Sequence, residues 1–257
     1  MRSGAGFAGS LLAGLLLALS ASPSVAGERE DAFMAGTTLN CAGCDLSYKS
    51  LKRRNLAGAD LSGATLEGTS FHRANLRGAN LSGVMALGAN FNAADLTFAN
   101  LTKANLEHAW FYLTDASRAD FTGSNMKSVL AGSARLILAK LDGVDLEGAD
   151  FQEARLGDAT FTNANLAYTD MQFASAVRAD FTGARGEQME WSDLSLRFAK
   201  LNGVTFSNCN LIRTDLSDAE LKGATFQDCN LLSAKLPEDR AGVTFRASIM
   251  PDNTMTR

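Results

Sequence analysis

The sequence predicts an all-β solenoid, and three features lead to that prediction. Every fifth residue from Leu46 to Leu236 keeps one register over 39 positions without an insertion, and 31 of these positions hold Leu or Phe. A small residue, most often Ala, stands two places before nearly all of them, the exceptions being Lys49, Arg54, Met189 and Leu194, and the other three places are mostly polar. Because neither a helix nor a flat strand repeats every five residues, we expect the chain to turn after each short extended segment.

Exceptions to the period support a shared core. Where the large residue shrinks to Ala86 or Ala131, the small site grows to Val84 or Val129, and such exchanges conserve core volume. The segment 183–198 is a second irregularity. Gly186 there replaces a large residue, Met189 and Leu194 enlarge the small site, and Trp191 is unusually bulky. Either a loop bulges here and displaces Trp191, or the core is locally repacked; departures of this kind often map to a binding face.

The repeated unit resembles the motif A-(D/N)-L-x-x of the pentapeptide-repeat family. It reads Ala59-Asp60-Leu61, Ala79-Asn80-Leu81 and Ala149-Asp150-Phe151, among many others. The resemblance implies a right-handed quadrilateral parallel β-helix with four pentapeptides in each 20-residue coil, and therefore about ten coils. It also implies that the Asp or Asn before the large residue hydrogen-bonds the turning backbone, as Asx side chains do elsewhere.

A period of 20 has independent support in the placement of the phenylalanines. Phe71, Phe91 and Phe111 would stack in one column of a 20-residue coil. Two further pairs share columns in the same way, namely Phe161 with Phe181 and Phe206 with Phe226.

Residues 1–26 are expected to be a cleavable signal peptide. Arg2 supplies a positive start, residues 11–19 are apolar, and Ser24 and Ala26 stand at the −3 and −1 places of a cleavage site. The apolar run is too short to span a bilayer, since spanning requires about 20 residues. We therefore expect a periplasmic or secreted protein with no stable membrane anchor after cleavage.

The remaining chain divides into three regions. Residues 27–45 are expected to cap the solenoid, with a short helix over residues 28–36. Residues 46–236 form the repeats, and residues 237–257 a degenerate last coil and tail. Pro237 interrupts the register, and two degenerate repeats follow, centred on Phe245 and Met250.

Four cysteines are candidates for disulfides. Cys41 and Cys44 form a C-x-x-C that resembles the CxGCDL sequence of exported family members; no helix follows to activate a thiol, and two further zinc ligands are missing. Cys209 and Cys229 occupy small inward sites at the same place in adjacent coils, so they should lie one above the other. They form either a disulfide or two reduced core thiols. About eight coils separate Cys44 from Cys209, which excludes a bridge between these two.

No catalytic, cofactor or metal site is apparent in the sequence. His72 and His108 fall in different columns nearly two coils apart, whereas a metal needs three or four convergent ligands. The net charge of −4 provides no basic surface for nucleic acid. An enzyme built on the irregular coil near Trp191 is disfavoured, because no nucleophile, base or metal set accompanies it.

The outward positions are unusually apolar in the middle of the repeats. Such a cluster marks an interaction site if it is exposed; alternatively, the chain bulges and Trp110 packs against the rod. The candidate patch comprises Phe98, Trp110, Tyr112, Leu113, Leu130, Ile137 and Leu138.

The sequence therefore predicts a non-enzymatic periplasmic or secreted interaction scaffold. Its partner is expected to be a protein, and its oligomeric state is open. The family resemblance implies an alternative, a DNA mimic that binds a type II topoisomerase, which the signal peptide and the modest charge disfavour. The acids compatible with such a mimic are Asp142, Asp145, Glu147, Asp150, Glu153 and Asp158.

Overall fold

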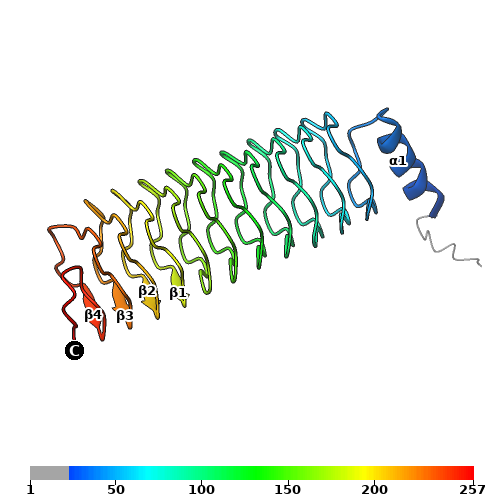
Figure 1. Cartoon of the computed structure of the whole chain (residues 1–257). Coiled ribbons are helices and arrows are strands. Elements are labelled where there is room, and N and C mark those ends of the chain that lie inside the picture. The colour runs from blue at the N-terminus through cyan, green and yellow to red at the C-terminus, as the bar shows by residue number, and fades with distance from the viewer. Residues whose placement is uncertain (1–22) are drawn as a thin grey trace, which may run out of the picture.

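The computed structural model describes residues 23–257, which form a rod of stacked coils with a helix at its N-terminal end (Figure 1). Helix α1 spans Pro23–Ala35. Single parallel bridges join most coils, and the rod is a right-handed quadrilateral β-helix, as predicted. On one side of the last coils lie the short strands of one parallel sheet, in the order β1 (Arg185–Glu187), β2 (Thr205–Ser207), β3 (Thr225–Gln227) and β4 (Thr244–Arg246).

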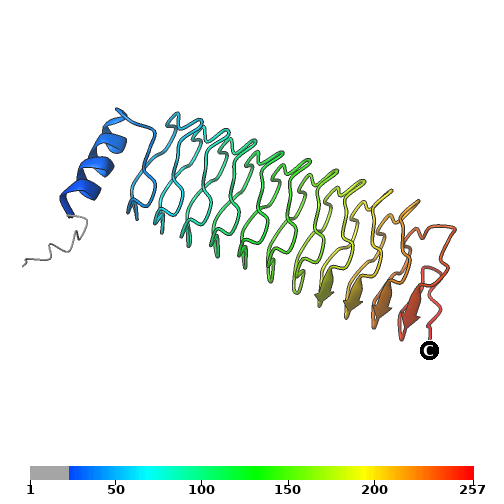
Figure 2. The ribbon, with the colours of Figure 1, turned by 180° about the vertical axis from the view of Figure 1, so that it is seen from behind.

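Equivalent residues of successive coils lie side by side along the rod. Parallel bridges pair each participating residue with its equivalent in the next coil, from Asn40 with Asp60 to Asp215 with Lys235. The last coil is one residue shorter, since Phe226 in β3 pairs with Phe245 in β4. The missing residue falls in the segment that Pro237 begins. Successive coils therefore stack in line along most of the rod, as the view from behind also shows (Figure 2).

The corners of the coil depend on one residue in the left-handed region of backbone space. Every fifth residue from Gly43 to Ser233 has a φ between 51° and 72°. Backbone hydrogen bonds close these turns along the rod. For example, the Ala59 N–H donates to the Leu56 carbonyl at 3.0 Å. Glycine adopts this conformation without steric cost, whereas side-chain-bearing residues such as Phe98 and Leu113 adopt it under some strain.

The core consists of columns of inward side chains. Phe71, Phe91 and Phe111 stack in one column with ring centroids 5.1 Å apart, and Phe161 stacks on Phe181 at 4.7 Å. The third predicted column differs in detail, because the rings of Phe206 and Phe226 cross at 74°. Phe206 has Gly186 beside it in the preceding coil rather than a ring, and its ring packs against Trp191 instead.

The irregular segment 183–198 is a repacked core and contains no bulge. Bridges before and after it keep the register of the coils. A Cβ at Gly186 would clash with the Met189 sulfur, so Met189 fills the space that Gly186 leaves. Trp191 is fully buried, and its indole N–H donates to the Thr169 hydroxyl at 3.0 Å. The core volume is thus conserved by exchange between two inward sites.

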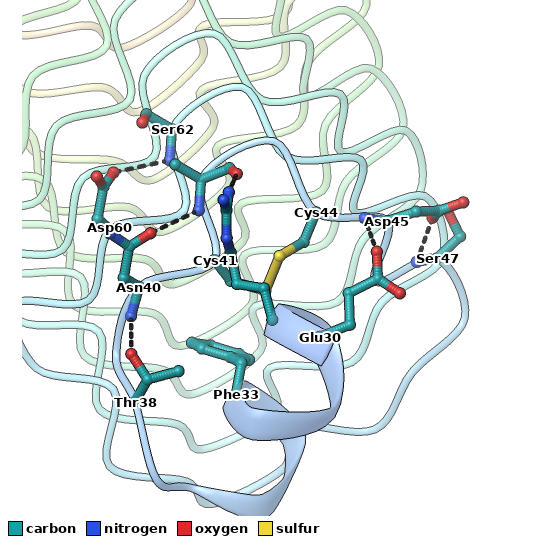
Figure 3. Close-up of a disulfide and its surroundings, with 12 residues drawn as sticks. Glu30, Phe33, Thr38, Asn40, Cys41, Cys44, Asp45, Ser47, Asp60 and Ser62 are labelled. Atoms are coloured by element: carbon teal, nitrogen blue, oxygen red, sulfur yellow. Dashed lines mark hydrogen bonds between the residues drawn. A yellow bond between two sulfur atoms is a disulfide. The ribbon is translucent and has the colours of Figure 1, made fainter. Parts of the chain in front are cut away.

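Helix α1 covers the N-terminal end of the core. It begins at Pro23, five residues earlier than predicted, which suits the preference of proline for the first helical turn. Phe33 is fully buried beside the Cys41–Cys44 disulfide (Figure 3). The Glu30 carboxylate accepts a hydrogen bond from the Asp45 N–H at 2.9 Å, which fastens the helix to the first coil.

Arg54 explains one exception to the repeat pattern. It replaces the small inward residue in the first coil, and its guanidinium donates to the carbonyls of Phe33 and Met34, each at 2.9 Å. The guanidinium also lies 5.6 Å from the centre of the Phe33 ring. A helix C-terminus leaves carbonyls unpaired and favours a cation, so Arg54 caps α1 from the adjoining coil.

The predicted signal peptide falls largely outside the described residues, because residues 1–22 are not described. The predicted cleavage point after Ala26 lies inside α1. A chain cleaved there would keep residues 27–35 of the helix, including the Glu30 and Phe33 contacts.

Candidate interaction surface

The candidate patch forms two groups on the rod. The first group surrounds Trp110, which is 47% exposed, and Leu130, which pairs with it on the next coil. Tyr112 and Leu113 occupy the adjoining corner and are also exposed. The Tyr112 ring lies over Gly132, 3.6 Å from the place of a Cβ there. The register passes through Trp110 without a bulge, so its indole is presented outward.

The second group lies one corner further around the coil. Phe98 and Leu138 are exposed in one corner column, separated by Arg118, and Ile137 beside them is partly buried. The Arg118 and Arg77 guanidiniums lie 5.3 and 5.0 Å from the centre of the Phe98 ring, one from each neighbouring coil. Phe98 therefore lies between two cations, and each cation is attracted to the negatively polarised face of the ring.

A polar pair separates the two groups. Asp115 and Arg135 occupy the side between the two corners, with 3.9 Å between the Arg135 Nε and an Asp115 carboxylate oxygen. With Phe98, Ile137 and Leu138 they line a shallow hollow of about 270 Å³. The sequence placed the seven apolar residues in one neighbourhood but missed the two arginines on Phe98. A sequence signal could have identified these arginines, because they stand at the same corner as Phe98, one coil before it and one coil after it.

The Asp and Asn residues before the large core residues form hydrogen bonds at the turns. Asp60 accepts from the Ser62 N–H at 3.1 Å, and Asn75 accepts from the Arg77 N–H at the same distance. The same bond recurs along the rod. Hydrogen bonds from Ser62 hold the pKa of Asp60 below its ordinary value. These Asp and Asn side chains therefore stabilise the turns, as the family resemblance implied.

Of the six acids named for a DNA mimic, three are paired with cations. Lys127 binds Glu147 at 2.8 Å and Asp145 at 3.3 Å, and these two carboxylates raise its pKa, chiefly through the hydrogen bond to Glu147. Asp158 forms a two-pronged pair with Arg178, at 2.7 and 2.6 Å. The hydrogen bonds from Arg178 hold the pKa of the Asp158 carboxyl below its ordinary value.

The other three acids have no cation partner within residues 23–257. Asp142 accepts hydrogen bonds from the hydroxyls of Thr160 and Thr162, and Glu153 accepts one from Ser133. Asp150 accepts from the Gln152 N–H at 2.9 Å. Cations of the rod thus neutralise half of the acids that the sequence alone indicated.

Both cysteine pairs are bonded in the structure. Cys209 and Cys229 lie on adjacent coils with Cα atoms 4.5 Å apart and form a disulfide. This selects the first of the two alternatives that their spacing left open. Cys41 and Cys44 form the second disulfide across the first turn of the solenoid, with Cα atoms 5.2 Å apart (Figure 3).

Within residues 23–257 no three His, Cys, Asp or Glu side chains are placed to hold a metal ion. His108 lies 3.7 Å from Glu107. No helix in this part of the chain is both long and apolar enough to cross a membrane.

One family profile matches the sequence, the pentapeptide repeats, in eight copies over residues 55–86, 87–127, 133–166, 145–183 and 192–236. The chain belongs to the pentapeptide repeat family. Proteins of this family are in general structural or interaction proteins. No curated protein matches the sequence.

Solved structures of the family resemble the chain. HetL, involved in heterocyst differentiation regulation in the cyanobacterium Nostoc sp. strain PCC 7120, is 27% identical with a TM-score of 0.39, over 90% of this chain and 98% of HetL. A protein of the Arabidopsis thaliana thylakoid lumen is 33% identical with a TM-score of 0.38, over 38% of this chain and 68% of its own. QnrB1, a plasmid-mediated fluoroquinolone resistance protein, is 22% identical with a TM-score of 0.30, over 78% and 87%.

Proposed function

We propose that this pentapeptide repeat protein is a non-enzymatic scaffold that binds a partner protein through the apolar patch around Trp110. One observation carries the proposal: Trp110 and Leu130 are about half exposed on adjacent coils, with Tyr112 and Leu113 beside them. Tryptophan and tyrosine are frequent anchors of protein interfaces, and contiguous exposed apolar groups mark such interfaces. The parallel bridges between coils already order the backbone beneath these side chains, which lowers the entropic cost of binding.

The proposal also places the protein in the periplasm or outside the cell. Two features support this location: the signal-peptide pattern of residues 1–26 and the pairing of all four cysteines. Disulfides persist in oxidising compartments and are rare in the cytosol. A fusion of residues 1–30 to a reporter that is active only outside the cytoplasm tests the location. An inactive reporter would contradict it.

Affinity capture tests the contact surface. The bait is the purified oxidised protein, and the test variant carries Trp110→Ser with Tyr112→Ser. The matched control carries Phe198→Ser with Tyr168→Ser, since these two aromatics are similarly exposed on other parts of the rod. We expect the control to retain its captured partners and the test variant to lose them. If the test variant retained every partner, the surface would be wrongly assigned.

The DNA mimic is the alternative, and its support is the row of acids from Asp142 to Asp158. Pairing of three of them with Lys127 and Arg178 weakens that support. The reporter fusion distinguishes the two functions, because a topoisomerase partner requires cytoplasmic retention. A retained fusion would favour the mimic.

A further inference from the structure

Charges are segregated on the face of the rod that carries Trp110. This Trp110 face consists of positions 50, 52 and 53 and of the positions stacked on each of them in the coils that follow. Its middle is the apolar group Trp110, Tyr112, Leu113 and Leu130. Its N-terminal end is basic, with Lys52, Arg53 and Arg73. Its other half is acidic, with Asp150, Glu153, Asp170 and Glu190.

The other parts of the coil arrange their charges differently. Lys140 pairs with Asp120, Lys200 with Asp180, and Arg178 with Asp158, in each case across adjacent coils. By contrast, none of these seven charged residues of the Trp110 face forms an ion pair within the described residues. The face therefore keeps unpaired cations at one end and unpaired carboxylates toward the other, where a pair of Asp193 with Arg213 follows them.

We propose that the Trp110 face binds a second copy of this chain, antiparallel to the first, about a two-fold axis between the coils of Trp110 and Leu130. This inference rests on the proposed function, because it names the partner of the same surface. The axis crosses the face at right angles to the rod, so each column of the face meets the same column of the second copy. Trp110 then contacts Leu130 of the second copy, and the contact occurs twice.

The same axis brings the two charged ends together. Arg73 lies two coils before the apolar middle, and Asp170 lies two coils after it, so their coils face each other across the dimer, with Arg73 in the column of position 53 and Asp170 in the column of position 50 of the same face. Lys52 lies three coils before the middle, and Glu190 lies three coils after it. Both ion-pair clusters occur twice by symmetry, as an isologous contact requires.

Charge also excludes the parallel arrangement. Two parallel copies would place Lys52, Arg53 and Arg73 against the same cations of the other copy, and acids against acids. Like charges opposed at an interface suppress that pairing, whereas opposite charges select the antiparallel one. The contact spans eight coils, or about 38 Å at roughly 4.8 Å per coil. The in-line stacking of the coils lets a second rod follow the face over this length (Figure 2).

A charge-exchange experiment tests the dimer. The purified oxidised protein is followed by sedimentation velocity, and a reversible dimer at micromolar concentration is expected. Variant A carries Lys52→Glu with Arg73→Glu, and variant B carries Asp170→Lys with Glu190→Lys. Each variant alone opposes like charges at both ends, so each should dimerise at least about tenfold more weakly. An equimolar mixture of A and B restores opposite charges at both ends and should dimerise as the wild type does.

Two further measurements make the result decisive. A control with Lys103→Glu and Lys222→Glu, exposed cations on another side, should dimerise normally. Circular dichroism of A and B should match the wild type, and their recovery on mixing shows that each is folded. A wild type that stays monomeric, or variants A and B that dimerise unchanged, would overturn the proposal.

The capture experiment separates the two proposals. If the wild type is monomeric and a different protein is still lost with Trp110→Ser and Tyr112→Ser, the dimer is wrong and the proposed function stands. If the charge exchange behaves as expected but that double variant still dimerises and captures normally, the dimer stands and the apolar surface is wrongly assigned.

Discussion

The sulfur of Met189 occupies the space in which a side chain of Gly186 would lie. The two residues belong to different inward sites, three places apart in one turn of the solenoid. The two residues depart from the repeat pattern in opposite directions. Gly186 lacks the large side chain that its site usually holds, whereas Met189 places a large side chain at a site that is usually small. Their contact explains why the coil of Trp191 keeps the register.

This contact predicts a strong coupling between the two sites. Gly186→Leu alone should overpack the core and lower the free energy of unfolding by about 1–3 kcal/mol. Met189→Ala alone should leave a cavity and cost about 2–5 kcal/mol. The double variant restores the ordinary repeat and should recover most of the loss, measured by urea denaturation. Strictly additive losses in the double variant would contradict the contact.

Removal of the Cys209–Cys229 disulfide should weaken the C-terminal coils. The bridge closes a loop of 20 residues, so Cys209→Ala with Cys229→Ala should cost about 3 kcal/mol. Hydrogen exchange should show the loss near Phe206 and Phe226, since contacts in a solenoid are between neighbouring coils. Non-reducing peptide mapping provides the control, and free thiols at both positions in the oxidised protein would contradict the bridge.

Arg54 should hold helix α1 on the first coil. Arg54→Ala removes both hydrogen bonds to the helix carbonyls, so the amides of α1 should exchange faster than in the wild type. Arg54→Lys keeps the charge but not the forked donors and should rescue only in part. Arg53→Ala, an exposed neighbour, is the matched control. Equal protection of α1 in all variants would show that Arg54 does not cap it.

Stability should change in opposite directions when glycine is removed from one left-handed corner and introduced at another. Gly123 has a φ of 67° and open space around its Cβ position, so Gly123→Ala should destabilise by about 0.5–1 kcal/mol. Ser128 has a φ of 52° in the next turn, and Ser128→Gly should stabilise by a similar or smaller amount. Thermal unfolding checks both, and changes of the same sign in the two variants would contradict the account.

Acid should weaken the Asp158–Arg178 contact. The pKa of the Asp158 carboxyl is lowered in the folded chain, mainly by the hydrogen bonds from Arg178. A carboxyl with a lowered folded pKa contributes stability that is present above its unfolded pKa and is lost as the pH falls through the folded value. Its contribution should therefore be full above the ordinary value of 3.8 and decline below it. In Arg178→Gln, NMR titration should find the Asp158 pKa closer to 3.8.

The five-residue register, together with the 20-residue coil that the family resemblance implied, predicted most of the fold. A strict period assigns each residue to a column and a direction, so the stacking of Phe71 on Phe91 and the alignment of Cys209 with Cys229 followed from counting. The candidate patch followed in the same way, because Trp110 and Leu130 occupy the same place in successive coils. The missing residue of the last coil was not predicted, since Pro237 marks an interruption without giving its length.

The order of the repeats was enough to assign each residue its place along and around the rod. How side chains on adjacent coils use the space between them depended on the folded arrangement. In the structure Cys209 is bonded to Cys229, and the ring of Phe206 crosses that of Phe226. The Asp115–Arg135 pair lies between the two groups of the patch. The physical reason is that a repeat specifies backbone position, whereas rotamers depend on neighbours a whole coil away in sequence.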